Sequence, residues 1–266
     1  MIKKIYQLIL DTYPFLTKAE KADFIKQSKT ILNKKLSFKA IEEMLNILSN
    51  GHAYIYPKRS TYTIRRISHK LIKDILYIKI PAWSGNLGGK DQNLINLCVN
   101  EKNKYKTIII DVRENNGGNS SIAHKFAGIF FKKDVIYGKI IRKNKKGILE
   151  EKPMTLQANG KIYLDKKIVI LISKRCFSSN ELFITPFKIS KRALLIGERT
   201  RGGSGNPIKE EIVINGKNYI VGIPRWRFFL KGKSRPIEET AIEPDIYFQS
   251  HNFEDIIRFI ENLKNN

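Results

Sequence analysis

The spacing of apolar residues predicts helices at the start of the chain. Residues 1–50 are expected to form two or three helices, and the clearest lies in LSFKAIEEMLNILSNG, residues 36–51. Apolar side chains recur there at the spacing of one helical face, with Ser37 as a candidate N-cap and Asn50-Gly51 as the expected end. From about residue 62 the pattern changes to one that is typical of strands.

Strand patterns dominate the rest of the chain. ILYIKIP, residues 75–81, alternates, whereas YKTIIIDV (105–112) and KKIVILIS (166–173) are continuous apolar runs. Continuous runs of this length are typical of parallel strands that are covered on both faces. A loop and a helical pattern follow each of the two runs, which indicates βαβ units. The sequence therefore predicts an α/β fold with a mixed, largely parallel sheet.

Two hairpins and a terminal helix complete the pattern. Residues 134–160 are predicted to form a surface hairpin with an irregular return. EIVINGKNYIVGIP carries Asn215-Gly216 between alternating segments, which is a strong signal for a two-residue hairpin turn. NFEDIIRFIENL is predicted as an amphipathic helix that Asn252 can cap.

Length and charge limit the possible organisation and partners. The 266 residues allow a core domain with a smaller attachment, and we expect a helical cap at residues 1–61 and a core domain at residues 62–266. Lys+Arg 49 and Asp+Glu 25 give a net charge of +24, which favours acidic peptides, nucleic acid or anionic membrane surfaces. Because the charge is dispersed along the chain, a general compositional bias explains it better than a dedicated basic patch.

The cysteines and the N-terminal segment bear on cofactors and location. Cys98 and Cys176 lie in apolar surroundings without metal-ligand spacing, so we expect buried thiols and no metal or cofactor. The apolar stretch in MIKKIYQLILDTYPF is interrupted by Gln7 and ends at Asp11. It is too short and too polar for a signal peptide or a membrane span, so a cytoplasmic location is expected.

Two turns that follow the buried strands carry candidate chemistry. In DVRENNGGNSS, Gly117 and Gly118 allow backbone N–H groups to approach a ligand. The loop is therefore interpreted either as an oxyanion cradle or as a simple tight turn. The loop lacks the glycine patterns of nucleotide-phosphate sites. In RCFSSNELF, Ser178 is either a helix cap paired with Glu181 or a nucleophile. Because parallel strands end at one edge of a sheet, both turns are expected at its ligand-binding edge.

A serine nucleophile also needs a base and a carboxylate that orients the base. His52 follows a predicted helix end, where the helix dipole would favour an imidazolium, and an ordinary post-helix histidine is the alternative. The remaining histidines are expected on the surface or in satisfied packing contacts: His69, His124 and His251. The carboxylate could come from a loop that otherwise reads as charged surface, through Glu238, Glu239 or Glu243.

The chain resembles the C-terminal processing (tail-specific) serine peptidases, in the branch with the tricorn core and the nisin-resistance protein. TIIIDVRENNGG is similar to the family's Asp-Leu-Arg-x-Asn-x-Gly-Gly, FSSNELF to its Ser-Ala-Ala-Glu-x-Phe, and ALLIGERTRGG to its Gly-Glu-x-Thr-x-Gly. LSNGHAYI resembles Leu-x-Asp-Gly-His-Thr, and IEETAIEPDI resembles Glu-Gly-x-Gly-Ile-x-Pro-Asp. These motifs, in the family's order across residues 48–246, imply a ClpP/crotonase-like core.

The resemblance implies site residues by position. The family nucleophile stands three residues before the motif glutamate, which selects Ser178 over Ser179, and the motif histidine falls on His52. The motif carboxylate stands six residues before the proline of Pro-Asp, which selects Glu238. The implied oxyanion donors are backbone N–H groups, one from Gly117 or Gly118 and the other from Ser179.

The chain departs from the family pattern at several positions. The lysine of a serine-lysine dyad belongs about where this chain has Gly202-Gly203, so the resemblance points to a serine-histidine-glutamate arrangement. Asn50 replaces the usual aspartate before Gly-His, and Pro186 should end or kink its helix after about two turns. About 23 residues separate His52 from the strand at residues 75–81, fewer than the roughly 50 of a small domain, so no inserted PDZ domain is expected.

The expected function is hydrolysis of peptide bonds in the C-terminal region of a peptide or protein. The alternative is a protein of the same fold that binds peptides or hydrophobic ligands with little or no catalysis. In that case the departures at Asn50 and Pro186 indicate that catalytic activity was lost. Nucleic-acid binding is a third hypothesis, motivated by charge alone and without a recognition module, so no nucleic-acid partner is expected. A short acidic peptide is the expected substrate, and the sequence carries no signal for an oligomeric state.

Overall fold

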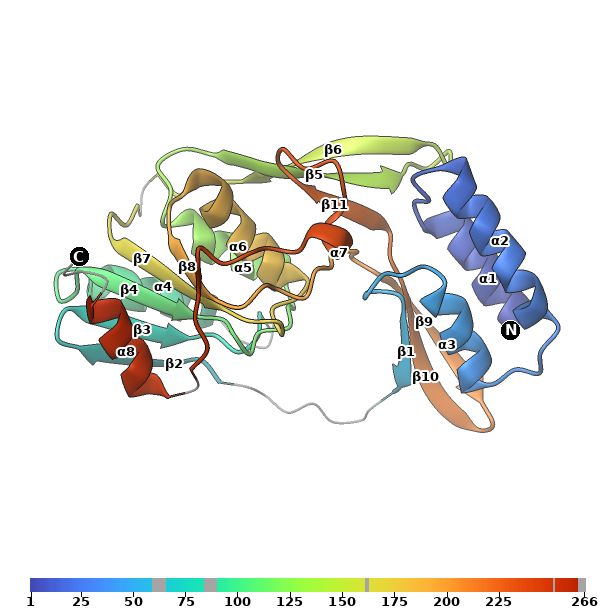
Figure 1. Ribbon diagram of the computed structural model, residues 1–266, viewed down its shortest axis with the longest axis horizontal. Coiled ribbons are helices and arrows are strands. Elements are labelled where there is room, and N and C mark those ends of the chain that lie inside the picture. The colour runs from blue at the N-terminus through green and yellow to red at the C-terminus, as the bar shows by residue number, and fades with distance from the viewer. Residues whose placement is uncertain (59–65, 84–89, 161–162, 251, 263–266) are drawn as a thin grey trace.

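The computed structural model describes residues 1–58, 66–83, 90–160, 163–250 and 252–262 (Figure 1). Its helices are α1 (Ile2–Thr12), α2 (Lys18–Leu32), α3 (Phe38–Asn46), α4 (Lys90–Asn100), α5 (Ser120–Gly128), α6 (Ser179–Ser190), α7 (Ile237–Thr240) and α8 (Phe253–Asn262). Its strands are β1 (Tyr54–Pro57), β2 (Ser68–Ile72), β3 (Ile75–Lys79), β4 (Thr107–Asp111), β5 (Val135–Lys143), β6 (Leu149–Leu156), β7 (Lys167–Ile172), β8 (Leu194–Gly197), β9 (Ile208–Ile214), β10 (Lys217–Ile223), β11 (Trp226–Leu230) and β12 (Ile246–Tyr247). Within these ranges, no helix combines the length and the apolar character that crossing a membrane requires.

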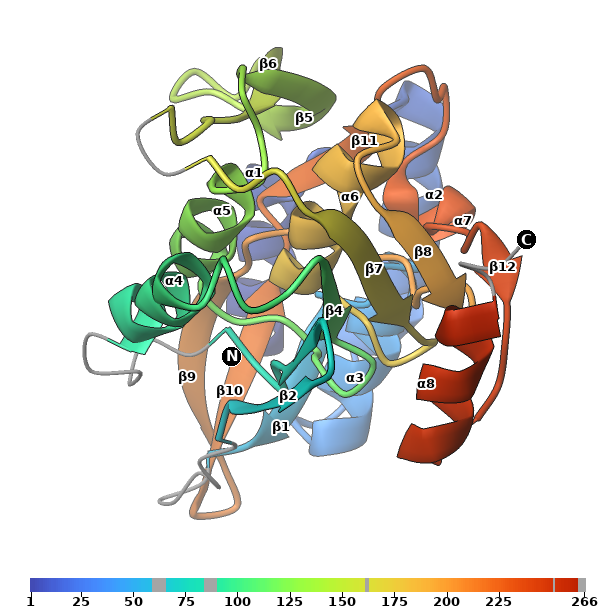
Figure 2. The same cartoon turned by 90° about the vertical axis from the view of Figure 1, so that its left-hand side faces the viewer.

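The central sheet holds its strands in the order β12-β8-β7-β4-β3-β2. Neighbours from β12 to β3 run parallel, and β2 pairs antiparallel with β3 at the edge. Since strand side chains alternate between faces, Ile108 and Ile110 of β4 pack in the core with α4, α5 and α6, whereas Ile109 packs with α8 (Figure 2). This arrangement confirms the predicted mixed, largely parallel sheet covered on both faces.

The N-terminal helices form a second core together with a small sheet. Helices α1, α2 and α3 pack against the sheet β1-β10-β9, and their shared apolar core includes Ile9, Phe24, Met44 and Val221. This layer lies at one end of the molecule and α8 at the other (Figure 1). The layer therefore combines the first helices with a hairpin from much later in the chain. The predicted domain boundary between residues 61 and 62 lies outside the described residues, and the division stays a prediction.

Local signals account for some element boundaries and not for others. The predicted hairpin at Asn215-Gly216 is confirmed, with positive φ at both residues as its turn type requires. Ser37 caps α3 by accepting a hydrogen bond from the Ala40 N–H (3.2 Å). The expected end of that helix at Asn50-Gly51 is wrong, because α3 stops at Asn46. Helix α6 likewise continues past Pro186 to Ser190, so the proline does not end it.

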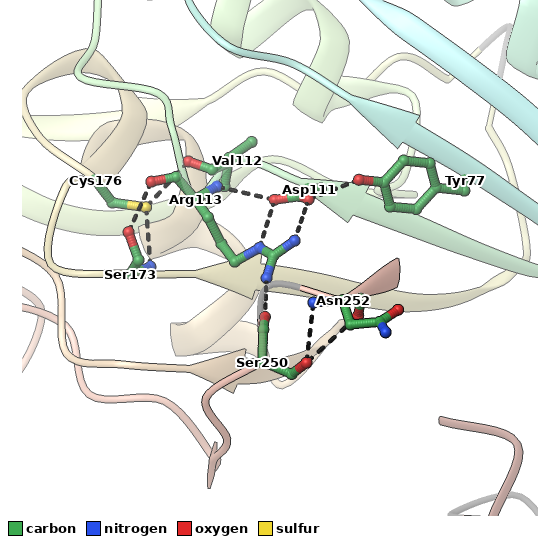
Figure 3. Close-up of polar contacts among 8 residues, drawn as sticks. All are labelled: Tyr77, Asp111, Val112, Arg113, Ser173, Cys176, Ser250 and Asn252. Carbon is green, nitrogen blue, oxygen red and sulfur yellow. Dashed lines mark hydrogen bonds and ion pairs between the residues drawn. The ribbon is translucent and has the colours of Figure 1, made fainter. Parts of the chain in front are cut away.

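A polar network holds the loop after β4 in place (Figure 3). Asp111 accepts hydrogen bonds from Arg113 Nε (3.0 Å), from Arg113 Nη2 (2.7 Å) and from the Tyr77 hydroxyl (2.7 Å). The Ser173 hydroxyl donates to the Arg113 carbonyl (2.6 Å), and Arg113 Nη1 donates to the Ser250 carbonyl (2.6 Å). Burial alone would raise the pKa of Asp111, but the Arg113 guanidinium lowers it overall. The network fastens the end of β4 to the end of β7, where the two predicted turns begin.

Candidate active site

Ser178 occupies a strained turn between β7 and α6. Its backbone has φ 59° and ψ −127°, a conformation that costs an L-residue free energy and persists only when its surroundings enforce it. Two hydrogen bonds from the Ser178 N–H do so, to the Gly203 carbonyl (3.0 Å) and to Glu181 Oε2 (3.2 Å). The turn leaves Ser178 Oγ 2.8 Å from Nε2 of His52, which lies 126 positions away in the chain.

His52 lies in the loop between α3 and β1 and is 4% exposed. Its ring stacks on Phe177 with the centroids 4.4 Å apart, and its backbone N–H donates to Asn50 Oδ1 (2.9 Å). Burial, together with a smaller effect of the Arg201 charge, lowers the pKa of His52 to about 4. The expected stabilisation of an imidazolium by the helix dipole is therefore wrong, because desolvation outweighs it and α3 ends well before His52.

Glu238 is distinguished from its neighbours by burial. Its side chain is 5% exposed, whereas Glu239 and Glu243 lie on the surface and pair with Arg235 and Arg199. Asn50 Nδ2 donates to Glu238 Oε1 (3.1 Å), so Asn50 contacts both Glu238 and the His52 backbone. Among the described residues, no hydrogen bond joins Glu238 to His52. Three buried atoms around Glu238 have no hydrogen-bond partner there: His52 Nδ1, Glu238 Oε2 and Arg227 Nε.

Arg227 connects Glu238 to the N-terminal helices. Arg227 Nε lies 3.5 Å from Glu238 Oε2, and Nη1 donates to Glu20 Oε1 and to the Tyr13 hydroxyl, both at 3.0 Å. Burial raises the pKa of Glu238, although the Arg227 charge acts in the opposite direction. The sequence analysis missed this network. An arginine in the apolar strand WRFFL was an available signal, because a charged side chain on a buried strand needs partners.

The glycine loop packs directly against the Ser178 turn. A Cβ on Gly117 would lie 2.8 Å from the Ser178 Cβ, and one on Gly118 would lie 1.9 Å from the Trp83 carbonyl oxygen. Gly117 and Gly118 have φ of 109° and 131°, so glycine is required at both positions for space and for conformation. The Ser179 hydroxyl joins the two turns by donating to the Gly118 carbonyl (2.7 Å). The predicted meeting of the two turns at one edge of the sheet is thus observed.

The two possible glycine donors differ in their contacts. The Gly117 N–H donates to Asn115 Oδ1 (2.8 Å). By contrast, the N–H groups of Gly118 and Ser179 donate to no acceptor in the part of the chain that the structure describes. Among the described residues, Gly117 therefore differs from Gly118 and Ser179 in that its N–H group is already engaged.

Glu181 braces the nucleophile turn from within the core. Besides Ser178, it accepts hydrogen bonds at Oε1 from the Thr200 hydroxyl (2.6 Å) and from the Gly202 N–H (3.0 Å). Burial raises the pKa of Glu181 to about 8, even though the hydrogen bonds that it accepts act in the opposite direction. Glu181 thus fastens the start of α6 to the loop at residues 200–203, and its bond from the Ser178 N–H is the one expected of the predicted capping pair.

Of the remaining histidines and cysteines, Cys176 lies in the nucleophile turn two positions before Ser178, and His251 lies outside the described residues. His124 pairs with the Tyr137 hydroxyl (2.9 Å), in agreement with the predicted packing role. Cys98 and Cys176 are buried free thiols, and burial raises the pKa of Cys98 to about 12. In the described ranges, no group of three or more histidine, cysteine, aspartate and glutamate side chains could hold a metal ion.

Comparison with known families agrees with this arrangement. The sequence-family model of peptidase family S41 matches residues 74–248. The chain belongs to peptidase family S41. The match includes Ser178, Glu238 and the glycine loop, whereas His52 and Asn50 precede it. The predicted family resemblance is confirmed.

Curated relatives in the S41 family are longer than this chain. A protein of Staphylococcus haemolyticus named "Probable CtpA-like serine protease" is 27% identical over 145 residues, which is 54% of this chain and 28% of that relative. A protein of Staphylococcus aureus strain N315 with the same name is 28% identical over the same share of each chain. The chain thus spans less than a third of the length of the curated relatives that it matches.

Solved structures share the fold at low identity. A candidate peptidase from Parabacteroides merdae superposes with a TM-score of 0.71 at 18% identity, covering 99% of this chain and 94% of that one. A lipoprotein from Streptococcus agalactiae gives 0.69 at 19% identity, with coverages of 98% and 95%. The photosystem II D1 C-terminal processing protease gives 0.53 at 19% identity, with coverages of 74% and 53%. At such identities the likeness shows the fold alone.

Proposed function

We propose that this S41 family member is a serine peptidase in which Ser178 attacks the scissile carbonyl. The observation that carries the proposal is the 2.8 Å contact between Ser178 Oγ and His52 Nε2. A histidine with a pKa of about 4 is neutral at neutral pH, so Nε2 can accept the Ser178 proton. His52 then returns that proton to the leaving amine.

Glu238 is proposed to stabilise the imidazolium that forms during the reaction. A buried donor without a partner costs free energy, and so does a buried acceptor. His52 Nδ1 and Glu238 Oε2 are such a pair of atoms within one site. We infer that they approach each other when His52 takes up the proton, while Asn50 holds Glu238 through its other oxygen.

The oxyanion is proposed to bind at the N–H groups of Gly118 and Ser179. Preorganised backbone donors of this kind stabilise the charge that develops on a carbonyl oxygen. The Ser179 N–H also lies at the start of α6, where the helix dipole favours negative charge. Because the Gly117 N–H is engaged with Asn115, we favour Gly118 of the two predicted glycines.

The substrate is proposed to be a short acidic peptide or the C-terminal region of a protein. The D1 processing protease, which shares the fold, is named for C-terminal processing, and the net charge of +24 favours acidic partners. A cytoplasmic location and the lack of a nucleic-acid partner stay predictions. Cell fractionation tests the first, and the salt dependence of any DNA or RNA affinity tests the second.

A fluorophosphonate probe tests the proposed function. We expect the native protein to become labelled, with the modification located on Ser178 by peptide mapping, because an activated serine attacks the phosphorus. Heat-denatured protein provides the control and should remain unlabelled. No label, or a label on Ser179, would remove the nucleophile assignment.

One observation favours the second candidate function, a peptide-binding protein with little or no catalysis. Glu238 contacts Asn50 and Arg227 but makes no hydrogen bond to His52 in the described structure. Mass spectrometry separates the two functions. Peptide that binds and stays intact over long incubation favours the binding protein, and cleavage products favour the peptidase.

The low pKa of His52 predicts the acid side of the pH profile. Because kcat/KM reports groups of the free enzyme, its acid limb should have a midpoint near pH 4. Activity should be retained from there up to neutral pH, since Nε2 must be unprotonated to act as a base. A profile of kcat/KM from pH 3.5 to 8 checks this. A midpoint near 6.5 would show that burial does not control the protonation of His52.

A further inference from the structure

Arg201 places an exposed positive charge beside the Ser178–His52 pair. Its guanidinium carbon lies 4.6 Å from the centre of the Phe177 ring, which itself stacks on His52. A Cβ on Gly51, the residue before His52, would lie 3.9 Å from Arg201 Nη2. The Arg201 guanidinium therefore borders the site, and Arg201 is exposed to solvent.

The backbone of Arg201 is tied to the nucleophile turn. The Arg201 N–H donates to the Cys176 carbonyl (3.0 Å), and the Gly203 carbonyl accepts from the Ser178 N–H (3.0 Å). Between them, the Gly202 N–H donates to Glu181 (3.0 Å). Each of these bonds joins the loop at residues 201–203 to the turn at residues 176–181. The position of Arg201 relative to Ser178 is consequently set by the fold.

No carboxylate of a described residue lies within ion-pair distance of Arg201. The acidic side chains of neighbouring segments have other partners: Glu181 binds Thr200, Glu238 lies against Arg227, and Glu198 lies near Lys174. The guanidinium carbon lies over the Phe177 ring, and no guanidinium N–H of Arg201 donates a hydrogen bond to a described residue, so these donors can meet a ligand. The edge of N–H donors matches a carboxylate, which it can bind through two parallel hydrogen bonds.

We propose that Arg201 binds a carboxylate of the peptide next to the scissile bond and so makes the site selective for acidic substrates. The inference rests on the proposed function and adds Arg201 as the residue that recognises the substrate carboxylate. Either an Asp or Glu side chain or the terminal carboxylate of the peptide supplies the same chemistry. Backbone N–H groups serve the oxyanion, so Arg201 acts on binding rather than on the bond that breaks.

The test compares Arg201→Gln with a matched variant, Arg199→Gln. Arg199 is an exposed arginine two positions away in the same loop, and it already pairs with Glu243 (3.2 Å). A cleaved peptide is prepared with Glu or Gln beside the scissile bond, each as the free acid and as the C-terminal amide. The four peptides distinguish a side-chain carboxylate from a terminal one.

Arg201→Gln is expected to raise KM about 10- to 100-fold for the peptides that carry the recognised carboxylate, with a smaller change in kcat. Peptides without that carboxylate should be cleaved about equally by both proteins. Arg201→Lys should recover part of the affinity, since it keeps the charge but not the fork of donors. The acid limb of kcat/KM should move to higher pH in Arg201→Gln, because the Arg201 charge lowers the His52 pKa.

Calorimetric binding in the Ser178→Ala background separates this proposal from the proposed function, because no hydrolysis is needed. Binding that depends on both Arg201 and the carboxylate supports the proposal even if the native protein cleaves nothing. Equal losses of affinity for carboxylate and neutral peptides would overturn it. So would a loss of the same size in Arg199→Gln.

Discussion

Replacing Ser178 with alanine is expected to lower kcat/KM for peptide hydrolysis by about 10⁶-fold and to abolish fluorophosphonate labelling. The reason is that Ser178 Oγ is the atom placed 2.8 Å from the base. His52→Ala should cost about as much, and the double variant should cost little more, because the two side chains act as one unit. Steady-state kinetics on the three variants, with thermal unfolding to confirm their fold, provide the measurement.

Ser179→Ala is the matched control for the Ser178 prediction. It keeps the backbone N–H and loses only the hydroxyl that donates to the Gly118 carbonyl. We expect a loss of about 10-fold or less, the effect of one hydrogen bond that positions the loop. Additive effects of Ser178→Ala and His52→Ala would contradict a shared role. A greater loss from Ser179→Ala than from Ser178→Ala would assign the role of nucleophile to Ser179 instead of Ser178.

Replacing Arg227 with methionine is expected to destabilise the protein by about 3 to 5 kcal/mol, the usual cost of removing one partner of a buried ion pair. Methionine preserves much of the volume but leaves the buried Glu238 without its cation and removes the donor to Glu20 and Tyr13. Urea unfolding measures the loss. The activity should fall as well, because Glu238 is no longer held in place.

The Arg227 effect should depend on pH. Burial without the cation raises the Glu238 pKa above its unfolded value, so the folded state binds the extra proton. In Arg227→Met, the stability that this proton contributes is fully present below about pH 4.5. It is lost as the pH rises through the raised pKa of Glu238. The deficit of Arg227→Met should therefore be smaller at pH 5 than at pH 8, and adding Glu238→Gln should recover part of it.

A nearby arginine provides the control for this prediction. The exposed Arg225 donates to the Asn206 carbonyl (2.9 Å) and lies outside the buried network. Arg225→Met should change the free energy of unfolding by about 0.5 kcal/mol or less. If the two variants lose similar stability, or if the Arg227→Met deficit is independent of pH, the ionic network does not stabilise the fold.

The errors of the sequence analysis share one cause. The helix end at Asn50-Gly51 and an end or kink at Pro186 were inferred from local residue preferences, whereas α3 stops at Asn46 and α6 continues to Ser190. The charge state of His52 was inferred from a helix dipole, whereas burial between Phe177 and the core controls it. For His52, desolvation exceeds a local dipole effect of about 1 kcal/mol or less.

The sequence by itself determined the elements and the turns between them. Continuous apolar runs specify β4 and β7, and the residues that follow specify the glycine loop and the Ser178 turn, because periodicity and turn chemistry act over a few neighbouring residues. Family resemblance then selected Ser178, His52 and Glu238 for roles that remain proposals.

Only the tertiary structure decided which side chains meet and in what charge state. Asn50 contacts Glu238 across 188 positions, and Arg227 contacts Glu20 across 207. Neither contact is visible as a repeating pattern of residue types in the sequence, because side chains so far apart are brought together by the packing of whole elements. The low pKa of His52, the contact of Arg201 with Phe177 and the hydrogen bond from the Gly117 N–H to Asn115 follow from that packing, since desolvation and hydrogen bonding depend on the complete set of neighbours.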